Sequence, residues 1–452
     1  MLSQKIIEKY NVSSPRYTSY PTILDWNQET LDGAVFETRL KSYLSSLAHL
    51  KSSVYVHLPF CESLCTFCGC HKHITKNHSV EEPYIDALLK EWNKYVSLTN
   101  DKKIAVEELH LGGGTPTFFS IQALDRLLAE LTKNRPKKVY YSVEGHPNNT
   151  TEEHLKLFRN YGFERISFGV QDYSPEVQQA INRIQSFEQV KKVTDQARKL
   201  GYKSISHDLV FGLPKQTKEG FENSILKTIQ LKPDAISLYS YAHVPWVKGT
   251  GQRGFDESDL PSGIEKRAIY ELAKTILINE GYEEIGMDHF GLKHEPLTKA
   301  KQQKSLNRNF MGYTAAKAEN LIGLGVSAIS EYPFGYAQNK KTVKEYHEAI
   351  NNSLFPVFKG HFHSEQDLEM KHHIKNLMCQ FETEYQDSLY LTKILESKAI
   401  KIKQLINDKI IKVSSNKITV TEDGQPFVRN VCMTIDPYIK DHEMEKKFSK
   451  SV

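Results

Sequence analysis

Several features that would place this chain in a special class are scarce or missing. The 452 residues include only six cysteines and carry a formal net charge of +4. These values indicate neither a disulfide-rich secreted scaffold nor a strongly basic nucleic-acid-binding protein. The longest mostly apolar run, residues 321–329, is far shorter than the ~20 residues that span a bilayer. The first five residues begin no apolar signal core. We therefore expect a cytoplasmic protein that neither inserts into a membrane nor binds nucleic acid.

What is present is an ordinary globular composition in a long chain. Hydrophobic residues make up 39% and charged residues 25%, which is typical of folded rather than disordered proteins. A chain of this length predicts roughly two or three domains.

Short runs of β-branched and aromatic residues alternate with amphipathic helical patterns between residues 53 and 290. The strand candidates cover residues 53–60, 107–112, 139–144, 165–171, 204–211, 235–241 and 283–287. Repeated strand–helix units imply a parallel sheet with right-handed crossovers, as a barrel or as an open α/β sheet. The candidates run into polar or glycine residues at Cys61, 112–115, Glu144, Gln171, Asp208, 241–243 and 288–289. The carboxyl ends of such strands carry the chemistry in parallel barrels, so one shared site is expected there.

The two ends of the chain have different patterns. Helical patterns over residues 365–385 and 394–407, followed by strand patterns over 410–413 and 417–421, predict a small α+β unit. The first residues are too few to form a core. We therefore divide the chain into an N-terminal extension (1–50) that covers the site, a catalytic domain (51–355) and a C-terminal helical and hairpin domain (356–452).

Four of the six cysteines lie between Cys61 and Cys70, directly after the first candidate strand. The C-x3-C-x2-C spacing of Cys61, Cys65 and Cys68 can hold three irons of a cubane cluster and leave the fourth iron open. An open metal position is typical of a catalytic site. The alternative is structural zinc, with Cys70 or His71 as a fourth ligand. Zinc modules usually combine two short pairs of cysteine or histidine ligands that lie well apart in sequence. No second pair of this kind is evident in the chain.

The cysteine spacing, with the aromatic Phe67 before the third cysteine, resembles the radical S-adenosylmethionine (SAM) superfamily. The resemblance implies a partial (β/α) barrel with a 4Fe–4S cluster on Cys61, Cys65 and Cys68. It implies one or two bound SAM molecules, and reductive cleavage of SAM at the open iron to a 5′-deoxyadenosyl radical. Cofactor contacts are implied for Tyr55, Phe67, Gly69, Gly113, Gly114, Thr115, Glu144, Gln171, Arg183, Asp208, Ala242 and Ile329.

Longer segments resemble the oxygen-independent coproporphyrinogen III oxidases over almost the whole chain, namely residues 14–22, 55–70, 208–217, 285–290, 308–314 and 325–330. That family converts two propionates of coproporphyrinogen III to vinyl groups in haem synthesis. The resemblance implies this reaction here, in a monomer supplied by an electron donor such as a flavodoxin or ferredoxin. Cys70, Tyr55 and His57 are the candidate catalytic residues. Tyr55 and His57 alternate along the first strand and are therefore predicted to share its inner face.

One departure concerns the segment after Glu144. Family members commonly have an acid–proline–arginine run there, whereas this chain has Gly-His-Pro-Asn at residues 145–148. Because the acid and the arginine of that run are missing, the sequence does not predict which charged groups pair beside Glu144. Arg16, Arg308 and Lys215 are candidates to receive the four carboxylates of the substrate, although each alone is more often a solvated charge.

Two other functions compete. A haem-trafficking paralogue of the radical enzymes usually has Phe at the position of Cys70 and lacks the segment at residues 14–22. A haem-degrading radical methyltransferase shares the three-cysteine loop but would not carry that segment. Both features favour the oxidase.

Overall fold

The computed structural model describes residues 3–27, 31–47, 50–99, 103–246, 251–252, 254–316, 319–440 and 448–451. Its largest sheet contains β1 (Leu50–Leu58), β4 (Ile104–Gly113), β5 (Tyr140–Gly145), β6 (Phe163–Gln171), β7 (Ser204–Phe211), β8 (Ala235–Ser240), β9 (Glu283–Gly286), β10 (His289–Gly291), β13 (Leu321–Leu324), β14 (Ile329–Tyr332), β15 (Gly335–Asn339) and β16 (Val357–Phe362). The order is β16-β15-β14-β13-β1-β4-β5-β6-β7-β8-β10-β9. The strands from β13 through β8 run parallel, and those at both ends run antiparallel.

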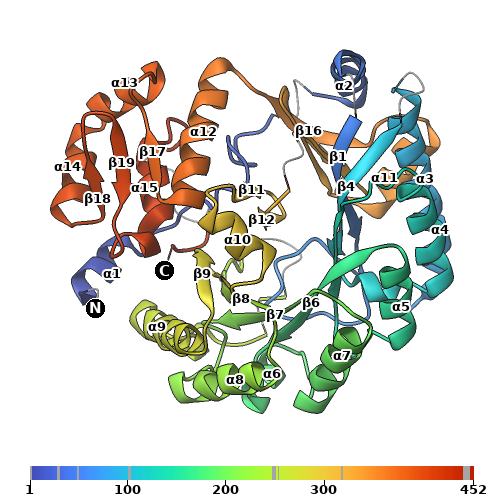
Figure 1. Cartoon of the computed structure of the whole chain (residues 1–452), viewed down its shortest axis with the longest axis horizontal. Coiled ribbons are helices and arrows are strands. Elements are labelled where there is room, and N and C mark those ends of the chain that lie inside the picture. The colour runs from blue at the N-terminus through green and yellow to red at the C-terminus, as the bar shows by residue number, and fades with distance from the viewer. Residues whose placement is uncertain are drawn as a thin grey trace.

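The helices that follow the parallel strands cover the outer face of this curved sheet (Figure 1). They are α3 (Glu81–Ser97), α4 (Ile121–Leu131), α5 (Glu152–Asn160), α6 (Pro175–Ala180), α7 (Phe187–Lys199), α8 (Lys218–Gln230) and α9 (Gly263–Asn279), with α10 (Pro296–Gln302) and α11 (Val343–Asn351) further along the chain. Leu111 and Ile166 of the sheet pack in one core with Leu88, Leu124 and Phe158 of the helices, all fully buried. The edge strands β9 and β16 are not neighbours in the described sheet. The predicted α/β fold with a partial barrel is confirmed.

The prediction for the last strand of the barrel was wrong. Residues 283–287 were expected to form one more parallel strand, but β9 pairs antiparallel with β10, and β10 pairs antiparallel with β8. Only Met287 and Asp288 separate β9 from β10, and Met287 has a left-handed φ of 38°. Two residues form a tight hairpin, whereas a parallel crossover needs a dozen or more. The other strand candidates agree with the structure to within about three residues.

The C-terminal residues form a separate small layer of helices on a sheet. It contains α12 (Glu365–Gln380), α13 (Leu389–Ser397), α14 (Ala399–Asn407), α15 (Val428–Ile435), β17 (Glu382–Glu384), β18 (Ile411–Val413) and β19 (Lys417–Val420). The helix predicted to reach residue 385 ends earlier, because Phe381 adopts a left-handed φ of 59° and β17 follows. The pattern over residues 394–407 covers the end of α13 and all of α14. β16 lies in the large sheet although it follows residue 356, and the three-part division of the chain stays a prediction.

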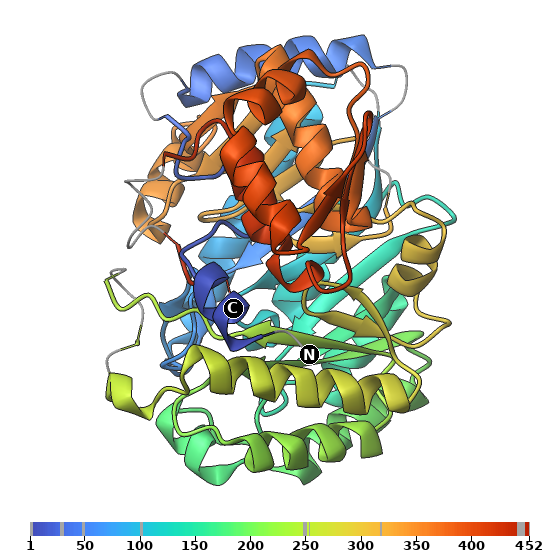
Figure 2. The same cartoon turned by 90° about the vertical axis from the view of Figure 1, so that its left-hand side faces the viewer.

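The N-terminal residues connect the C-terminal unit with the barrel. α1 (Gln4–Tyr10) packs Ile7 and Tyr10 into the core of the C-terminal unit, and α2 (Gly33–Ser46) contacts β16. The two chain ends lie side by side, since Ser13 forms a β-bridge with Lys450 (Figure 2). Four short strands complete the described strands: β2 (Phe60–Cys61), β3 (His73–Ile74), β11 (Asn307–Asn309) and β12 (Gly312–Thr314). None of the described helices has the length and apolar character needed to span a bilayer.

Candidate active site

The cysteine loop, residues 61–70, leaves the carboxyl end of β1 and is bound there by the glycine segment, residues 112–115. The Gly114 amide donates to the Leu58 carbonyl at 2.8 Å, and the Thr115 amide donates to the Phe60 carbonyl at 3.0 Å. The backbones approach so closely that a Cβ on Gly114 would lie 2.5 Å from the carbonyl carbon and oxygen of Pro59. Glycine is required at this position because any side chain would push the start of the cysteine loop away.

Gly114→Ala is therefore expected to displace the cysteine loop. Because the added methyl group meets rigid backbone, we expect a loss of about 1–3 kcal/mol in the free energy of unfolding and a lower iron content after reconstitution. Thermal melting and iron analysis measure the two effects. Gly220→Ala is the control, because its Cβ meets only the Thr217 hydroxyl at 3.1 Å in the first turn of α8. Equal behaviour of the two variants would contradict this role of Gly114.

The thiols of the cysteine loop have polar partners from distant strands. The Cys61 sulfur lies 3.3 Å from the Thr115 hydroxyl, and Arg183 Nη1 lies 3.8 Å from the Cys65 sulfur. Burial raises the pKa of Cys61 to about 11. A hydrogen bond between Cys68 and Cys70 lowers the pKa of Cys68 to about 6 and raises that of Cys70 well above its usual value.

The arrangement of these thiols bears on the metal they can hold. Across the described ranges, no three His, Cys, Asp or Glu side chains are grouped so that they could hold one metal ion. A zinc ion needs such a group. A cubane cluster binds each thiolate through a different iron, so its ligands stand further apart. The C-x3-C-x2-C spacing of Cys61, Cys65 and Cys68 fits such a cluster.

Tyr55 and His57 lie on the inner face of β1. The Tyr55 hydroxyl is 2.9 Å from His57 Nδ1, and His57 Nε2 is 2.8 Å from the carbonyl oxygen of His71. Because Nε2 must donate to that carbonyl, Nδ1 accepts the proton of Tyr55. Burial lowers the pKa of His57 to about 4, so the ring is uncharged at neutral pH. A Cβ on Gly113 would lie 2.7 Å from the His57 ring, which places the pair beside the glycine segment. Their catalytic role stays a prediction.

Two carboxylates, Glu144 of β5 and Asp208 of β7, point to the inner face of the sheet. Glu144 Oε1 lies 3.2 Å from His110 Nε2, and its Oε2 accepts the Gly113 amide at 3.3 Å. Desolvation raises the pKa of Glu144, but the contacts with His110 and Gly113 outweigh it and lower the pKa overall. Asp208 accepts a hydrogen bond from Ser167 at 2.6 Å, and desolvation raises its pKa. The ionised Glu144 can accept hydrogen bonds from an ammonium group or from hydroxyls.

Gln171 is the last residue of β6, and Arg183 follows α6. Arg183 Nη2 donates to the Gly169 carbonyl at 2.6 Å, whereas its Nε is buried without a partner. Gln171 adopts a left-handed φ of 66°, which turns the chain at the end of the strand. An unpaired guanidinium N–H next to Cys65 is the group that a carboxylate would satisfy. The residues present therefore fit a cofactor that carries an amino acid.

A second group of predicted contacts is held together by Gln252. Its Nε2 donates to the Phe67 carbonyl at 3.2 Å and to the Ala242 carbonyl at 2.9 Å. Gly69 has open space around its Cα, since an added Cβ would meet no atom within 4 Å. Ile329 begins β14, two strands away from β1. Sequence reasoning missed Gln252, because a single glutamine in a loop has no pattern of its own.

A cavity of about 680 Å³, called the main cavity below, lies inside the curved sheet. Its wall contains the predicted Glu144 and Asp208. It also contains residues that sequence reasoning missed, including His110, Ser142, Ser167, Tyr239, His289 and Tyr313. His110 was foreseeable, because it alternates with Gly112 along β4. The site thus combines a thiol loop and a glycine cradle at the carboxyl ends of parallel strands with two carboxylates, Glu144 near the end of β5 and Asp208 in the middle of β7.

Comparison with known proteins agrees with this geometry. A model of the radical SAM superfamily matches residues 55–227. The oxygen-independent coproporphyrinogen III oxidase of Salmonella typhimurium is 35% identical over 99% of this chain and 98% of its own length. The enzyme of that name from Helicobacter pylori is 38% identical, with 98% of each chain covered. The chain belongs to the oxygen-independent coproporphyrinogen III oxidase family.

A solved member of this family has the same fold. The coproporphyrinogen III oxidase of Escherichia coli, described as a radical SAM enzyme, matches with a TM-score of 0.89 at 33% identity, covering 97% of this chain and 99% of that one. The family prediction and the prediction of a radical SAM enzyme are confirmed. Membership in the superfamily implies a 4Fe–4S cluster and SAM, whereas the individual site residues stay predictions.

The segment that departs from the family pattern is held by polar contacts. Asn148 Nδ2 donates to the Ile184 carbonyl at 2.9 Å, next to Arg183, and Asn149 Nδ2 donates to Glu62 of the cysteine loop at 3.0 Å. Burial lowers the pKa of His146 to about 3, so this side chain is neutral. In this chain, hydrogen bonds donated by two neutral asparagines thus join the end of β5 to both neighbouring loops.

Proposed function

We propose that this chain oxidises coproporphyrinogen III to protoporphyrinogen IX without oxygen, converting two propionates to vinyl groups. The observation that carries the proposal is the full-length agreement in sequence and fold with enzymes of that name, which includes the segment at residues 14–22. The main cavity supports the proposal, because it is large and has the candidate cofactor residues Glu144 and Asp208 on its wall.

The residues of the site have separate tasks in this proposal. Cys61, Cys65 and Cys68 hold the cluster, and Glu144 and Arg183 bind the amino and carboxylate groups of SAM. When bound, the cluster and SAM supply a radical that removes one hydrogen atom from the β-carbon of a propionate. Loss of carbon dioxide, and transfer of one electron to an external electron acceptor, would then leave the vinyl group.

The surroundings protect this chemistry. Tyr55 and His57 are buried and hydrogen-bonded to each other, so they provide a rigid, uncharged wall next to the glycine segment. Such a wall excludes water from a site where a reactive radical forms. Cys70 stands beside Cys68 and is proposed to take part in turnover.

Stoichiometry and partners are part of the proposal. We propose up to two SAM molecules for each chain, as the family resemblance implies. We also propose that the protein acts as a monomer in the cytoplasm and receives electrons from a flavodoxin or ferredoxin. Equilibrium dialysis with SAM and size-exclusion chromatography measure the first two quantities.

The direct test is anaerobic reconstitution of the cluster, followed by incubation with coproporphyrinogen III, SAM and a reductant. We expect protoporphyrinogen IX, with no product when SAM is omitted. Cleavage of SAM without vinyl formation would contradict the proposal. Tight haem binding with no turnover would instead support the trafficking function of the paralogue.

A further inference from the structure

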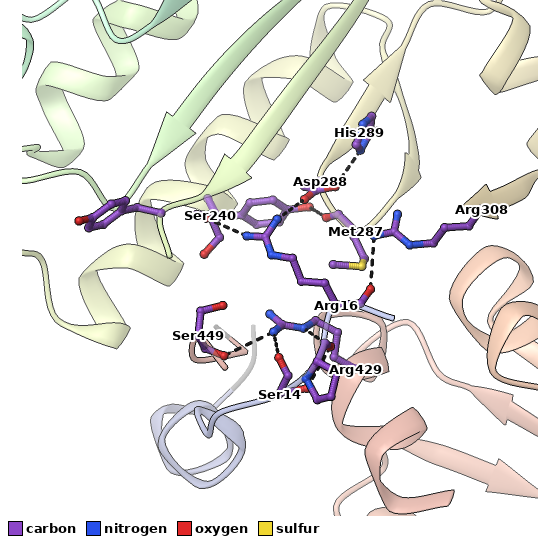
Figure 3. Close-up of polar contacts among 12 residues, drawn as sticks. Ser14, Arg16, Ser240, Met287, Asp288, His289, Arg308, Arg429 and Ser449 are labelled. Atoms are coloured by element: carbon purple, nitrogen blue, oxygen red, sulfur yellow. Dashed lines mark hydrogen bonds and ion pairs between the residues drawn. The ribbon is translucent and has the colours of Figure 1, made fainter. Parts of the chain in front are cut away.

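Three arginines from distant parts of the chain converge where the N-terminal segment, the barrel and the C-terminal unit meet (Figure 3). Arg16 belongs to the N-terminal segment, Arg308 to β11 and Arg429 to α15. We call these three residues the arginine cluster. In the described part of the chain, their sole ion pair joins Arg16 Nη1 to Asp288 at 3.9 Å. Asp288 also accepts a hydrogen bond from His289 at 2.7 Å.

Arg429 has a structural task within the cluster. It is only 4% exposed, and its guanidinium donates to the carbonyls of Ser14, Pro15, Ser449 and Lys450. Because these bonds join both chain ends, Arg429 fixes the path of the segment that carries Arg16. Arg429 is therefore a positioning residue.

Arg308, in contrast, has vacant donors, and Arg16 is only loosely paired. Arg16 donates to the Ser240 carbonyl at 3.0 Å, and its ion pair with Asp288 is long. Arg308 donates through Nη2 to the Arg16 carbonyl at 3.4 Å, whereas its Nε and Nη1 are buried without partners. Buried guanidinium N–H groups are normally hydrogen-bonded, so these vacant donors indicate a missing acceptor.

The charge balance indicates an anionic acceptor. Asp288 neutralises one of the three arginines, and burial together with Arg16 lowers the pKa of Arg429 to about 9. Burial and the same neighbours lower the pKa of Lys266 to about 7. Cations that are brought together away from water stabilise a bound anion strongly.

The cluster lies behind the wall of the main cavity: Arg16 lines a small neighbouring cavity together with Asp288, and Arg308 lines another together with Tyr17. His289, the partner of Asp288, lines the main cavity, and so does Tyr313, whose ring lies 4.6 Å from the Arg308 guanidinium. The hairpin of β11 and β12 also brings Phe310 within 4.9 Å of the Tyr55 ring. An anion on the cluster can therefore belong to a molecule that extends from the main cavity past His289 and Tyr313.

We propose that Arg16 and Arg308 together bind a propionate carboxylate that the substrate keeps through the reaction, with Arg429 positioning Arg16. The inference rests on the proposed function, which supplies a substrate with four carboxylates. The planar fork of arginine matches a carboxylate. A clamp on the reacting propionate would stabilise the charge that disappears with carbon dioxide, and so it would oppose the reaction. A propionate that is retained keeps its charge throughout, so a clamp on it does not oppose the reaction. Lys215, the third sequence candidate, contacts Asp259 through its backbone instead.

The test compares Arg16→Gln and Arg308→Gln with the unchanged protein. The probes are coproporphyrin III, the stable oxidised form of the substrate, and its tetramethyl ester, titrated by fluorescence. We expect each variant to bind the free acid roughly 10–100-fold more weakly, as loss of a charged hydrogen bond implies, with little change for the ester. Arg308→Lys keeps the positive charge but lacks the planar guanidinium. It should therefore bind the free acid more tightly than Arg308→Gln and more weakly than the unchanged protein. Arg126→Gln is the control, because Arg126 pairs with Glu82 and Asp86 on the outer helices.

The outcomes separate the two hypotheses. Unchanged binding of the free acid by both Gln variants, or an equal loss for acid and ester, would overturn the carboxylate clamp. If the unchanged protein makes no protoporphyrinogen but still binds the free acid in an arginine-dependent way, the clamp stands and the proposed function fails. Cluster content and melting temperature, measured for every variant, identify any that do not fold.

Discussion

Replacement of Cys61, Cys65 or Cys68 by Ser is expected to reduce bound iron and product formation to near zero. Each thiolate is the sole protein ligand of one iron in the proposed cluster, and a serine hydroxyl is a far poorer ligand for iron than a thiolate. Iron and sulfide analysis after anaerobic reconstitution, with visible and electron paramagnetic resonance spectra, measures the loss.

The chain offers matched controls for this experiment. Cys379 and Cys432 are 2% and 0% exposed and lie in hydrophobic cores away from the loop. Their serine variants should lose stability, because a hydroxyl is buried, but should keep the cluster. If Cys70→Ser lost its cluster as completely as the three ligand variants, the assignment of ligands would be wrong.

Cys70→Ser is instead expected to keep the cluster and cleave SAM while product formation falls on the order of 100-fold, the range of a single group acting in the reaction. The hydrogen bond to Cys68 and the charge of that neighbour raise the pKa of the Cys70 thiol well above its usual value. It is therefore held as a protonated thiol. A thiol donates a hydrogen atom or an electron readily, whereas a hydroxyl does not.

The readout must separate chemistry from packing. Product and 5′-deoxyadenosine are both quantified, because uncoupled SAM cleavage shows that the cofactor site survives. Cys70→Ala removes the hydrogen bond as well and should behave like the Ser variant. Near-normal product from either variant would leave Cys70 as a small packing residue.

Local spacing explains which parts of the site could be predicted. Cys61, Cys65 and Cys68 lie within one loop, so the chain itself brings them together. Glu144 lies near the end of β5 and Asp208 in the middle of β7, and the alternation of strand side chains directs both to the inner face of the sheet. The hairpin of β9 and β10 was missed because its strand pattern resembles that of a parallel strand. The direction depends on the two-residue turn at Met287, which the pattern does not contain.

The sequence by itself determined the fold class, the cysteine ligand set as a hypothesis and the family resemblance, since these depend on motifs and on the period of the chain. Only the tertiary structure decided that Arg16, Arg308 and Arg429 meet around Asp288, and that Gln252 joins Phe67 to Ala242. These partners are separated by a hundred residues or more in most cases. Their meeting depends on how α1, the barrel and the C-terminal unit pack, and packing of distant surfaces leaves no periodic signal in the chain.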